Sequence, residues 1–184
     1  MERPPCPQRQ LHDSLLASAA DPALAHKPAV IVEGMPYTYA QLLDASQRLA
    51  AGLLARGVTR GDRVAIYMDN SWPCVVSIFA VLLAGGVFLL INPQTKSEKL
   101  GFILDDSGAR LLLTDGHLAQ EFVPLFGHGL SPAQMVSSGK LPESDTANRY
   151  SPRTSSIRFC MFVAMPRPTG ISSTSLLFPP DASE

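Results

Sequence analysis

The sequence predicts an α/β fold: a partial doubly wound, mostly parallel sheet with helices on its faces, followed by an irregular tail. Segments with helical and strand periodicity alternate between Leu11 and Phe126, and turn residues separate them. This alternation is typical of parallel strands joined by helices that pack back onto the sheet. We therefore expect a lead-in at residues 1–10, an ordered unit at 11–127 and an irregular or disordered tail at 128–184.

The first segments predict a helix and a short hairpin. Apolar residues at helical spacing indicate a helix over Leu11–Ala20, which ends before Pro22 because a residue that precedes proline avoids the helical conformation. Pro28–Glu33 has the apolar and β-branched residues of a short strand. After a turn, Tyr37–Tyr39 is expected to return as a second short strand.

The most clearly marked helix begins after Thr38. Thr38 and Gln41 have the spacing of a capping box, in which a hydroxyl and a side-chain amide satisfy backbone groups reciprocally. Gly57 suits the left-handed position that ends many helices. The apolar face of this helix comprises Leu42, Leu43, Ser46, Leu49, Ala50, Leu53 and Leu54.

A strand, a buried helix and a second strand come next. We expect Arg63–Met68 to be a strand and residues 69–71 to provide the N-cap of a helix from about Trp72 to Ala84. That helix is apolar on nearly all sides, which predicts contacts with several other elements. Val87–Ile91 is apolar on both faces, as a buried parallel strand would be.

One more repeat of helix, strand and helix is predicted. Thr95 and Glu98 have the spacing of a second capping box, and the helix that follows ends at Gly108. Arg110–Thr114 is expected to be a strand, and Asp115 to cap a last helix. The apolar residues expected along these two helices are Leu100, Ile103 and Leu104, and then Leu118, Phe122, Leu125 and Phe126.

The residues after Gly129 show neither helical nor strand periodicity. Between Thr146 and Pro180 there is no acidic residue, but there are four arginines. One apolar run, Phe159–Met165, is long enough for a strand. Scattered serines and prolines of this kind are typical of a flexible tail.

Cys74–Ile91 is an almost unbroken apolar run close to the minimum length of a membrane span. Gly85 and Gly86 interrupt it, and each glycine costs a helix interior about 1 kcal/mol relative to alanine. The run is therefore better explained by a buried helix that stops at the glycines and leads into a buried strand. Membrane attachment through this run is the lesser alternative.

Charge and cysteine content exclude several classes of protein. Charged residues make up 17% of the chain, hydrophobic residues 46%, and the formal net charge is −1, so we expect a packed core and no nucleic-acid partner. Cys6, Cys74 and Cys160 are odd in number and far apart. They indicate neither a disulfide framework nor a zinc motif, and they favour a cytoplasmic location.

Isolated polar residues do not indicate a catalytic or metal site, and none is assigned. The histidines, which lie at no ligand spacing with one another or with a cysteine, are His12, His26, His117 and His128. His117 is expected at the surface. Asp105–Asp106 is interpreted as the solvated end of a helix and Cys74 as an inert buried thiol. Gly85–Gly86 lacks the G-x-G-x-x-G order of a dinucleotide site.

The order of these segments resembles the N-terminal part of AMP-forming acyl-CoA synthetases, of the adenylate-forming ligase superfamily. The similar segments are TYAQL, LAAGLLARGVTRGDRVAIYMDNS and FAVLLAGGVFLLINPQTKSEKLGFILDDSGARLLLTD, within about residues 11–126. Among them, NPQTKSEKL is more similar to the acyl-CoA ligase branch than to the amino-acid-activating branch.

The resemblance implies a two-step ligase. With ATP and Mg²⁺ it converts a carboxylic acid to an acyl-adenylate, and it then transfers the acyl group to coenzyme A. The family's phosphate loop reads T-S-G-S/T-T-G-x-P-K-G, and its catalytic lysine lies on a C-terminal domain. Arg167–Ser175 is at about the expected place of that loop but has no lysine, and Thr154–Ser156 is a weaker match. No functional residue of the family is carried over.

Two hypotheses about function follow. The first is an N-terminal fragment of an acyl-CoA ligase, ended after Gly127 by truncation or a shifted reading frame. It would be inactive alone, because the phosphate loop and the C-terminal domain are missing. The second is a non-catalytic binding or regulatory module derived from the same fold.

Overall fold

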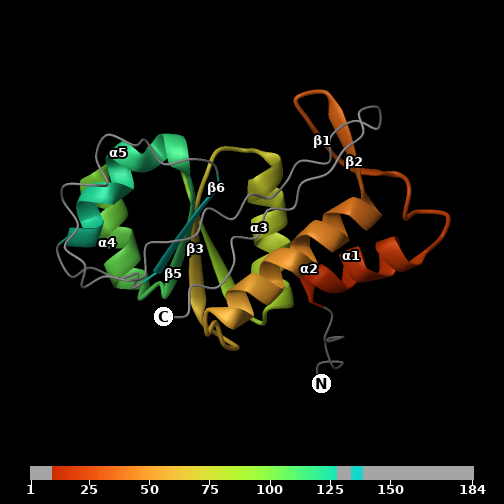
Figure 1. Ribbon diagram of the computed structural model, residues 1–184, viewed down its shortest axis with the longest axis horizontal. Coiled ribbons are helices and arrows are strands. Elements are labelled where there is room, and N and C mark those ends of the chain that lie inside the picture. Colours follow the sequence, from red (N-terminus) through yellow and green to blue (C-terminus); the bar gives the residue numbers. More distant parts are fainter. Residues whose placement is uncertain (1–9, 128–133, 139–184) are drawn as a thin grey trace, which may run out of the picture.

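The computed structural model describes residues 10–127 and 134–138. It contains a parallel sheet in the strand order β4-β3-β5-β6 and a separate hairpin, β1-β2 (Figure 1). The strands of the parallel sheet are β3 (Arg63–Tyr67), β4 (Val87–Ile91), β5 (Leu111–Asp115) and β6 (Gln134–Ser138). The predicted α/β class is confirmed.

Helices cover both faces of the parallel sheet, as Figure 1 shows to its left and right. On one face, α2 (Tyr39–Ala55) and α3 (Trp72–Leu83) share a hydrophobic core with the sheet. On the other, α4 (Ser97–Ser107) and α5 (Ala119–Phe122) do so. The β3 and β5 residues in the first core are Val64, Ile66, Leu111 and Leu113, and those in the second are Ala65, Tyr67 and Leu112. This alternation follows from the two-residue period of a strand, and it confirms the doubly wound arrangement.

The N-terminal elements lie beside α2. Helix α1 (Leu11–Ala20) has the predicted limits and contacts α2 and α3. Strands β1 (Pro28–Val32) and β2 (Met35–Thr38) pair antiparallel. The returning strand therefore starts earlier than expected and includes Pro36, which a strand tolerates where it has a free edge.

Helix α2 begins at the predicted capping box. The Thr38 hydroxyl accepts a hydrogen bond from the Gln41 backbone N–H at 3.3 Å, and the Gln41 side-chain oxygen accepts one from the Thr38 N–H at 2.9 Å. The helix is followed by Gly57, whose φ of 80° lies in the left-handed region, as expected.

Helix α3 ends where the paired glycines were expected to end it. Gly85 has a φ of 79°, and a Cβ atom on Gly86 would lie 3.0 Å from Val81 Cγ1 and 3.2 Å from the Asp62 carbonyl oxygen. The close approach of two chain segments therefore favours glycine at Gly86, because a Cβ atom there would force its neighbours to shift. Within residues 10–127 and 134–138, every helix is too short or too polar to cross a membrane.

Strand β4 is not buried on both faces as predicted. It lies at the edge of the sheet, and its Val87 and Leu90 side chains are each 52% exposed. The strands buried between two layers of helices are β3 and β5. An apolar run has the same composition at the edge of a sheet as at its centre, so the sequence did not reveal the place of β4 in the strand order.

The prediction of a second capping box, formed by Thr95 and Glu98, is wrong. Helix α4 begins at Ser97, and its N-cap Lys96 makes no side-chain capping bond. The Glu121 carboxylate, from α5, accepts hydrogen bonds from the Ser97 N–H and hydroxyl at 2.9 and 2.8 Å. A residue distant in sequence thus satisfies the start of this helix.

The single last helix expected after Asp115 is three short segments: η1 (Gly116–Leu118), α5 and η2 (Val123–Gly127). Asp115 itself is the last residue of β5 and makes no side-chain capping bond. Pro124 in η2 has no backbone N–H to continue an α-helical ladder.

The sheet also continues beyond the ordered unit that the sequence indicated. Strand β6, within the stretch expected to be irregular, pairs parallel with β5. Hydrogen bonds to a neighbouring strand can order a segment whose own side chains show no period. The possible strand Phe159–Met165 lies outside the described residues, as do Arg167–Ser175 and Thr154–Ser156.

Candidate functional site

The chain leaves the carboxyl ends of β3 and β5 toward opposite faces of the sheet. These strands are neighbours, yet β3 leads into α3 on one face and β5 leads into α5 on the other. In open α/β sheets, ligands bind in the crevice at such a topological switch point. The polar side chains at this point are therefore the first candidates for function.

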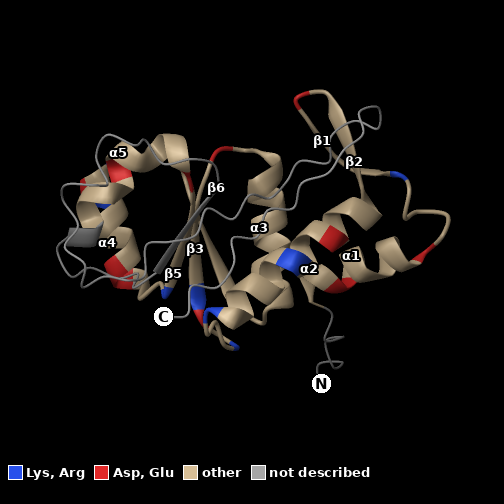
Figure 2. Cartoon of the chain, viewed as in Figure 1, with Lys and Arg blue, Asp and Glu red and all other residues tan. Residues whose placement is uncertain are grey.

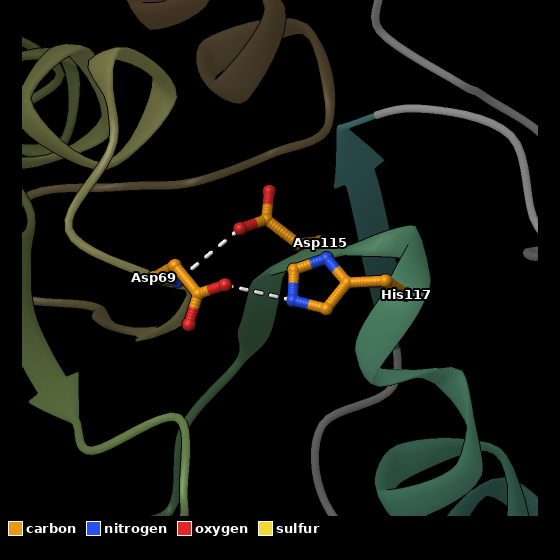
Figure 3. Close-up of side chains that lie close together, drawn as sticks. All are labelled: Asp69, Asp115 and His117. Atoms are coloured by element: carbon orange, nitrogen blue, oxygen red, sulfur yellow. Dashed lines mark hydrogen bonds and ion pairs between the residues drawn. The ribbon is translucent and has the colours of Figure 1, made fainter. Parts of the chain in front are cut away.

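Three potential metal ligands meet at this switch point (Figure 3). Asp69 follows β3, Asp115 ends β5, and His117 lies in η1. The distance between His117 Nε2 and Asp69 Oδ2 is 2.8 Å, and the Asp69 backbone N–H donates to Asp115 Oδ2 at 3.2 Å. One ligand atom from each residue lies within 4.8 Å of the other two. Two carboxylates and an imidazole could together hold a metal ion.

The cluster has one fixed member and two members open to solvent. Asp115 is only 7% exposed, whereas the side chains of Asp69 and His117 are 54% and 59% exposed. A solute can therefore reach the exposed side, while the buried carboxylate is held in place by the strand that carries it.

Cys74, at the start of α3, is not a nucleophile of this site. Burial raises the pKa of its thiol, the nearby charge of Asp115 raises it further, and a hydrogen bond with the Ser71 backbone acts weakly in the opposite sense. A buried thiol with a raised pKa stays protonated and unreactive near neutral pH. The expectation of an inert buried thiol agrees with this environment.

Tyr67, the last residue of β3, fixes the loop between β4 and α4. Its hydroxyl lies 3.0 Å from the Pro93 carbonyl oxygen and 2.7 Å from that of Thr95, and donates its proton to this pair. Burial raises the pKa of Tyr67, and the charges of Glu121 and Asp69 raise it further. The hydroxyl therefore remains a donor rather than a catalytic base.

Glu121 holds α5 against the start of α4. Its carboxylate accepts a hydrogen bond from Lys96 Nζ at 2.9 Å, in addition to those from Ser97. The hydrogen bond from Lys96, and then those from Ser97, lower the pKa of Glu121. This carboxylate is engaged in joining two helices.

The amino ends of β3 and β5, opposite the switch point, have a separate set of polar contacts. Figure 2 shows Lys and Arg residues gathered there, beneath β3 and β5. The Asp62 carboxylate accepts hydrogen bonds from the backbone N–H and hydroxyl of Thr59 at 2.7 and 2.9 Å, and Arg110 Nη1 lies 3.3 Å from it. The Thr59 hydrogen bonds, with a smaller contribution from Arg110, lower the pKa of Asp62.

Sequence reasoning did not find the cluster at the switch point. Asp69 and Asp115 are 46 residues apart, and the parallel pairing of β3 with β5 brings them together. The spacing of histidines and cysteines does not reveal it, because two of its three members are aspartates. The signal that could have revealed the cluster is the polar residue after each of two predicted strands, since the carboxyl ends of parallel strands share one edge.

The other polar residues singled out in the sequence lie apart from this cluster. Asp105 and Asp106 are exposed near the end of α4, His12 lies in α1, and His26 lies in the turn before β1. Of the four histidines, His128 lies outside the described residues.

The described residues do not by themselves form the nucleotide-binding site of an adenylating enzyme. Within residues 10–127 and 134–138, no loop combines serine, threonine and glycine with a following lysine. Backbone N–H groups and a lysine are what a phosphate loop needs to hold the charge of a triphosphate. The weak candidate Arg167–Ser175 lies in the part of the chain that is not described.

Comparison with known proteins gives a family match over most of the chain. The model for the family described as "AMP-binding enzyme" matches residues 17–170, which extends past the residue 126 where the resemblance was expected to end. Tyrocidine synthase 3 of Brevibacillus parabrevis is 33% identical over 115 residues, which are 62% of this chain and 2% of that protein. Phosphinothricin tripeptide synthetase PhsC of Streptomyces viridochromogenes is 40% identical over 113 residues, which are 60% of this chain and 10% of that protein.

Solved structures support the same relationship. A long-chain-fatty-acid-CoA ligase from Archaeoglobus fulgidus superimposes with a TM-score of 0.67 and 26% identity, over 73% of this chain and 28% of that chain. This chain thus spans about a quarter of the ligase and a smaller share of each peptide synthetase. Both branches, acyl-CoA ligases and peptide synthetases, are among its relatives.

Proposed function

The chain belongs to the AMP-binding enzyme family, and we propose that it supplies the N-terminal scaffold of a domain that activates a carboxylic acid with ATP. The observation that carries the proposal is the family match over residues 17–170, on a doubly wound sheet that superimposes on a solved acyl-CoA ligase. In the proposed reaction a carboxylate oxygen bonds to the α-phosphorus of ATP, and pyrophosphate leaves.

We infer that the described residues form a scaffold for that reaction and supply none of its catalytic groups. Strands β3 and β5 are buried between helices, and the capped helix α2 covers one face of the sheet. Because the described residues hold no phosphate loop, we propose that ATP and Mg²⁺ bind only where the rest of such a domain is present. We further propose that the 184 residues do not catalyse adenylation alone.

Two versions of this function differ in the acid that is activated and in the acceptor of the acyl group. The segment around residues 92–100 and the structural match to a fatty-acid ligase support coenzyme A as the acceptor. The curated relatives named above are peptide synthetases, which supports an amino acid as the acid activated. Both versions share the adenylation step, so that step is the one to test first.

The test is carboxylate-dependent exchange of pyrophosphate into ATP. We expect no exchange by the purified chain with fatty, aromatic or amino acids. We expect exchange when residues 17–138 replace the matching segment of a full-length acyl-CoA ligase, with a chimera that carries a scrambled segment as the control. Exchange by the chain alone would refute the assignment of a scaffold role. A folded chimera that supports no exchange with any acid would refute the assignment of this stretch to an adenylating domain.

A further inference from the structure

We propose that Asp69, Asp115 and His117 bind a divalent transition-metal ion at the switch point between β3 and β5. The proposal is independent of the adenylation function, since it needs no nucleotide and rests only on side chains that the structure describes. The three donor groups come from Asp69 after β3, from Asp115 at the end of β5 and from His117 in η1.

The donor set selects the class of ion. Two carboxylate oxygens and one imidazole nitrogen suit Mn²⁺ and its neighbours in the first transition row. Mg²⁺ and Ca²⁺ prefer oxygen ligands throughout, and soft ions prefer thiolates.

The geometry allows the three donors to close around one ion. Donor atoms that each lie about 2.0–2.2 Å from a metal are roughly 3–4 Å from one another. The corresponding atoms of Asp69, Asp115 and His117 already lie within 4.8 Å of one another. The two exposed side chains can rotate by the small remaining amount, and the buried Asp115 stays fixed on its strand. The Nε2 atom of His117 already faces the Asp69 carboxylate (Figure 3).

The direct test is a titration of the full 184-residue chain with Mn²⁺, in which the electron paramagnetic resonance signal of the free ion is followed. Mn²⁺ is the probe because it binds thiolates poorly, so the cysteines do not contribute. We expect one ion per chain, and a loss of affinity of at least about tenfold in both His117→Gln and Asp69→Asn. Both substitutions are at exposed side chains, so neither is expected to unfold the chain.

Matched controls are His26→Gln and Asp106→Asn, which change the same residue types at exposed positions away from the cluster. Both should bind Mn²⁺ as the unchanged chain does. As a second measurement, Mn²⁺ should raise the thermal midpoint of the unchanged chain but not that of His117→Gln, because an ion that binds only the folded state stabilises it. An unchanged free-ion signal with the native chain would refute the site. Equal affinities for the native chain and the two cluster variants would also refute it.

Discussion

Replacing Phe122 with alanine would test whether α5 packs on the second face of the sheet. Phe122 is the larger of the two buried side chains of α5, and its exposed fraction is 0%. Its ring lies in the hydrophobic core that joins α4, α5 and the sheet. The substitution should leave a cavity where α5 packs against α4 and the sheet.

The expected cost follows from this burial. A fully buried phenylalanine gains about 1.5–3 kcal/mol on leaving water, and the cavity left by alanine adds to the loss. We therefore expect the free energy of unfolding to fall by about 3–4 kcal/mol. With a urea dependence of about 1–3 kcal/mol per molar, the midpoint of urea unfolding should fall by roughly 2 M.

The matched control is Phe102→Ala, on the neighbouring helix α4. Phe102 is 68% exposed, so its loss should change the free energy of unfolding by less than about 0.5 kcal/mol. If Phe122→Ala prevents folding, Phe122→Leu should still lower the stability by about 1 kcal/mol. Equal midpoints for the two alanine variants, measured by circular dichroism in urea, would refute the packing described for α5.

Three further predictions concern caps, turns and pH. Thr38→Ala should lower the free energy of unfolding by about 1 kcal/mol, whereas Thr95→Ala, at the box that does not form, should change it little in the same urea experiment. Gly108→Ala should cost about 1–2 kcal/mol, because its φ of 59° strains any residue with a Cβ; thermal unfolding would measure this. Hydrogen bonds lower the pKa of Asp62 and Glu121 below their ordinary values of 3.8 and 4.5, so the folded chain binds fewer protons than the unfolded chain in acid. The stability that both carboxylates contribute at neutral pH is therefore lost as the pH falls below these values. The double variant Asp62→Asn, Glu121→Gln should show a flatter dependence of the urea midpoint on pH, and an unchanged dependence would contradict this.

Features that depend on a few residues adjacent in the sequence could be predicted from it. The Thr38–Gln41 box and the left-handed Gly85 after α3 depend on backbone conformation within one turn of the signal. The α/β class was equally accessible, because the alternation of periods is itself local. These features needed no knowledge of strand order.

Features that depend on strand order or on distant partners could not be predicted in this way. The exposure of Val87 follows from the edge position of β4, which no periodicity within Val87–Ile91 reveals. The start of α4 is satisfied by Glu121, 24 residues after Ser97, so a search for a capping residue next to the helix found the wrong one. The cluster around Asp115 needed both the pairing of β3 with β5 and the direction of the loops that follow them.

The register between β3 and β5 links the polar cluster to the two hydrophobic cores. Ile66 lies opposite Leu113 and Tyr67 opposite Thr114, which places Asp115 one step beyond the end of β3. A slip of one residue would carry every β5 side chain to the other face of the sheet, so that Leu113 and Leu112 would exchange cores. A misfolded register would therefore lose both cores and the meeting of Asp69 with Asp115 together. The burial of Leu112 and Leu113 thus stabilises the one register that also brings Asp69 and Asp115 together. The alignment of the cluster therefore depends on leucines that are not part of it.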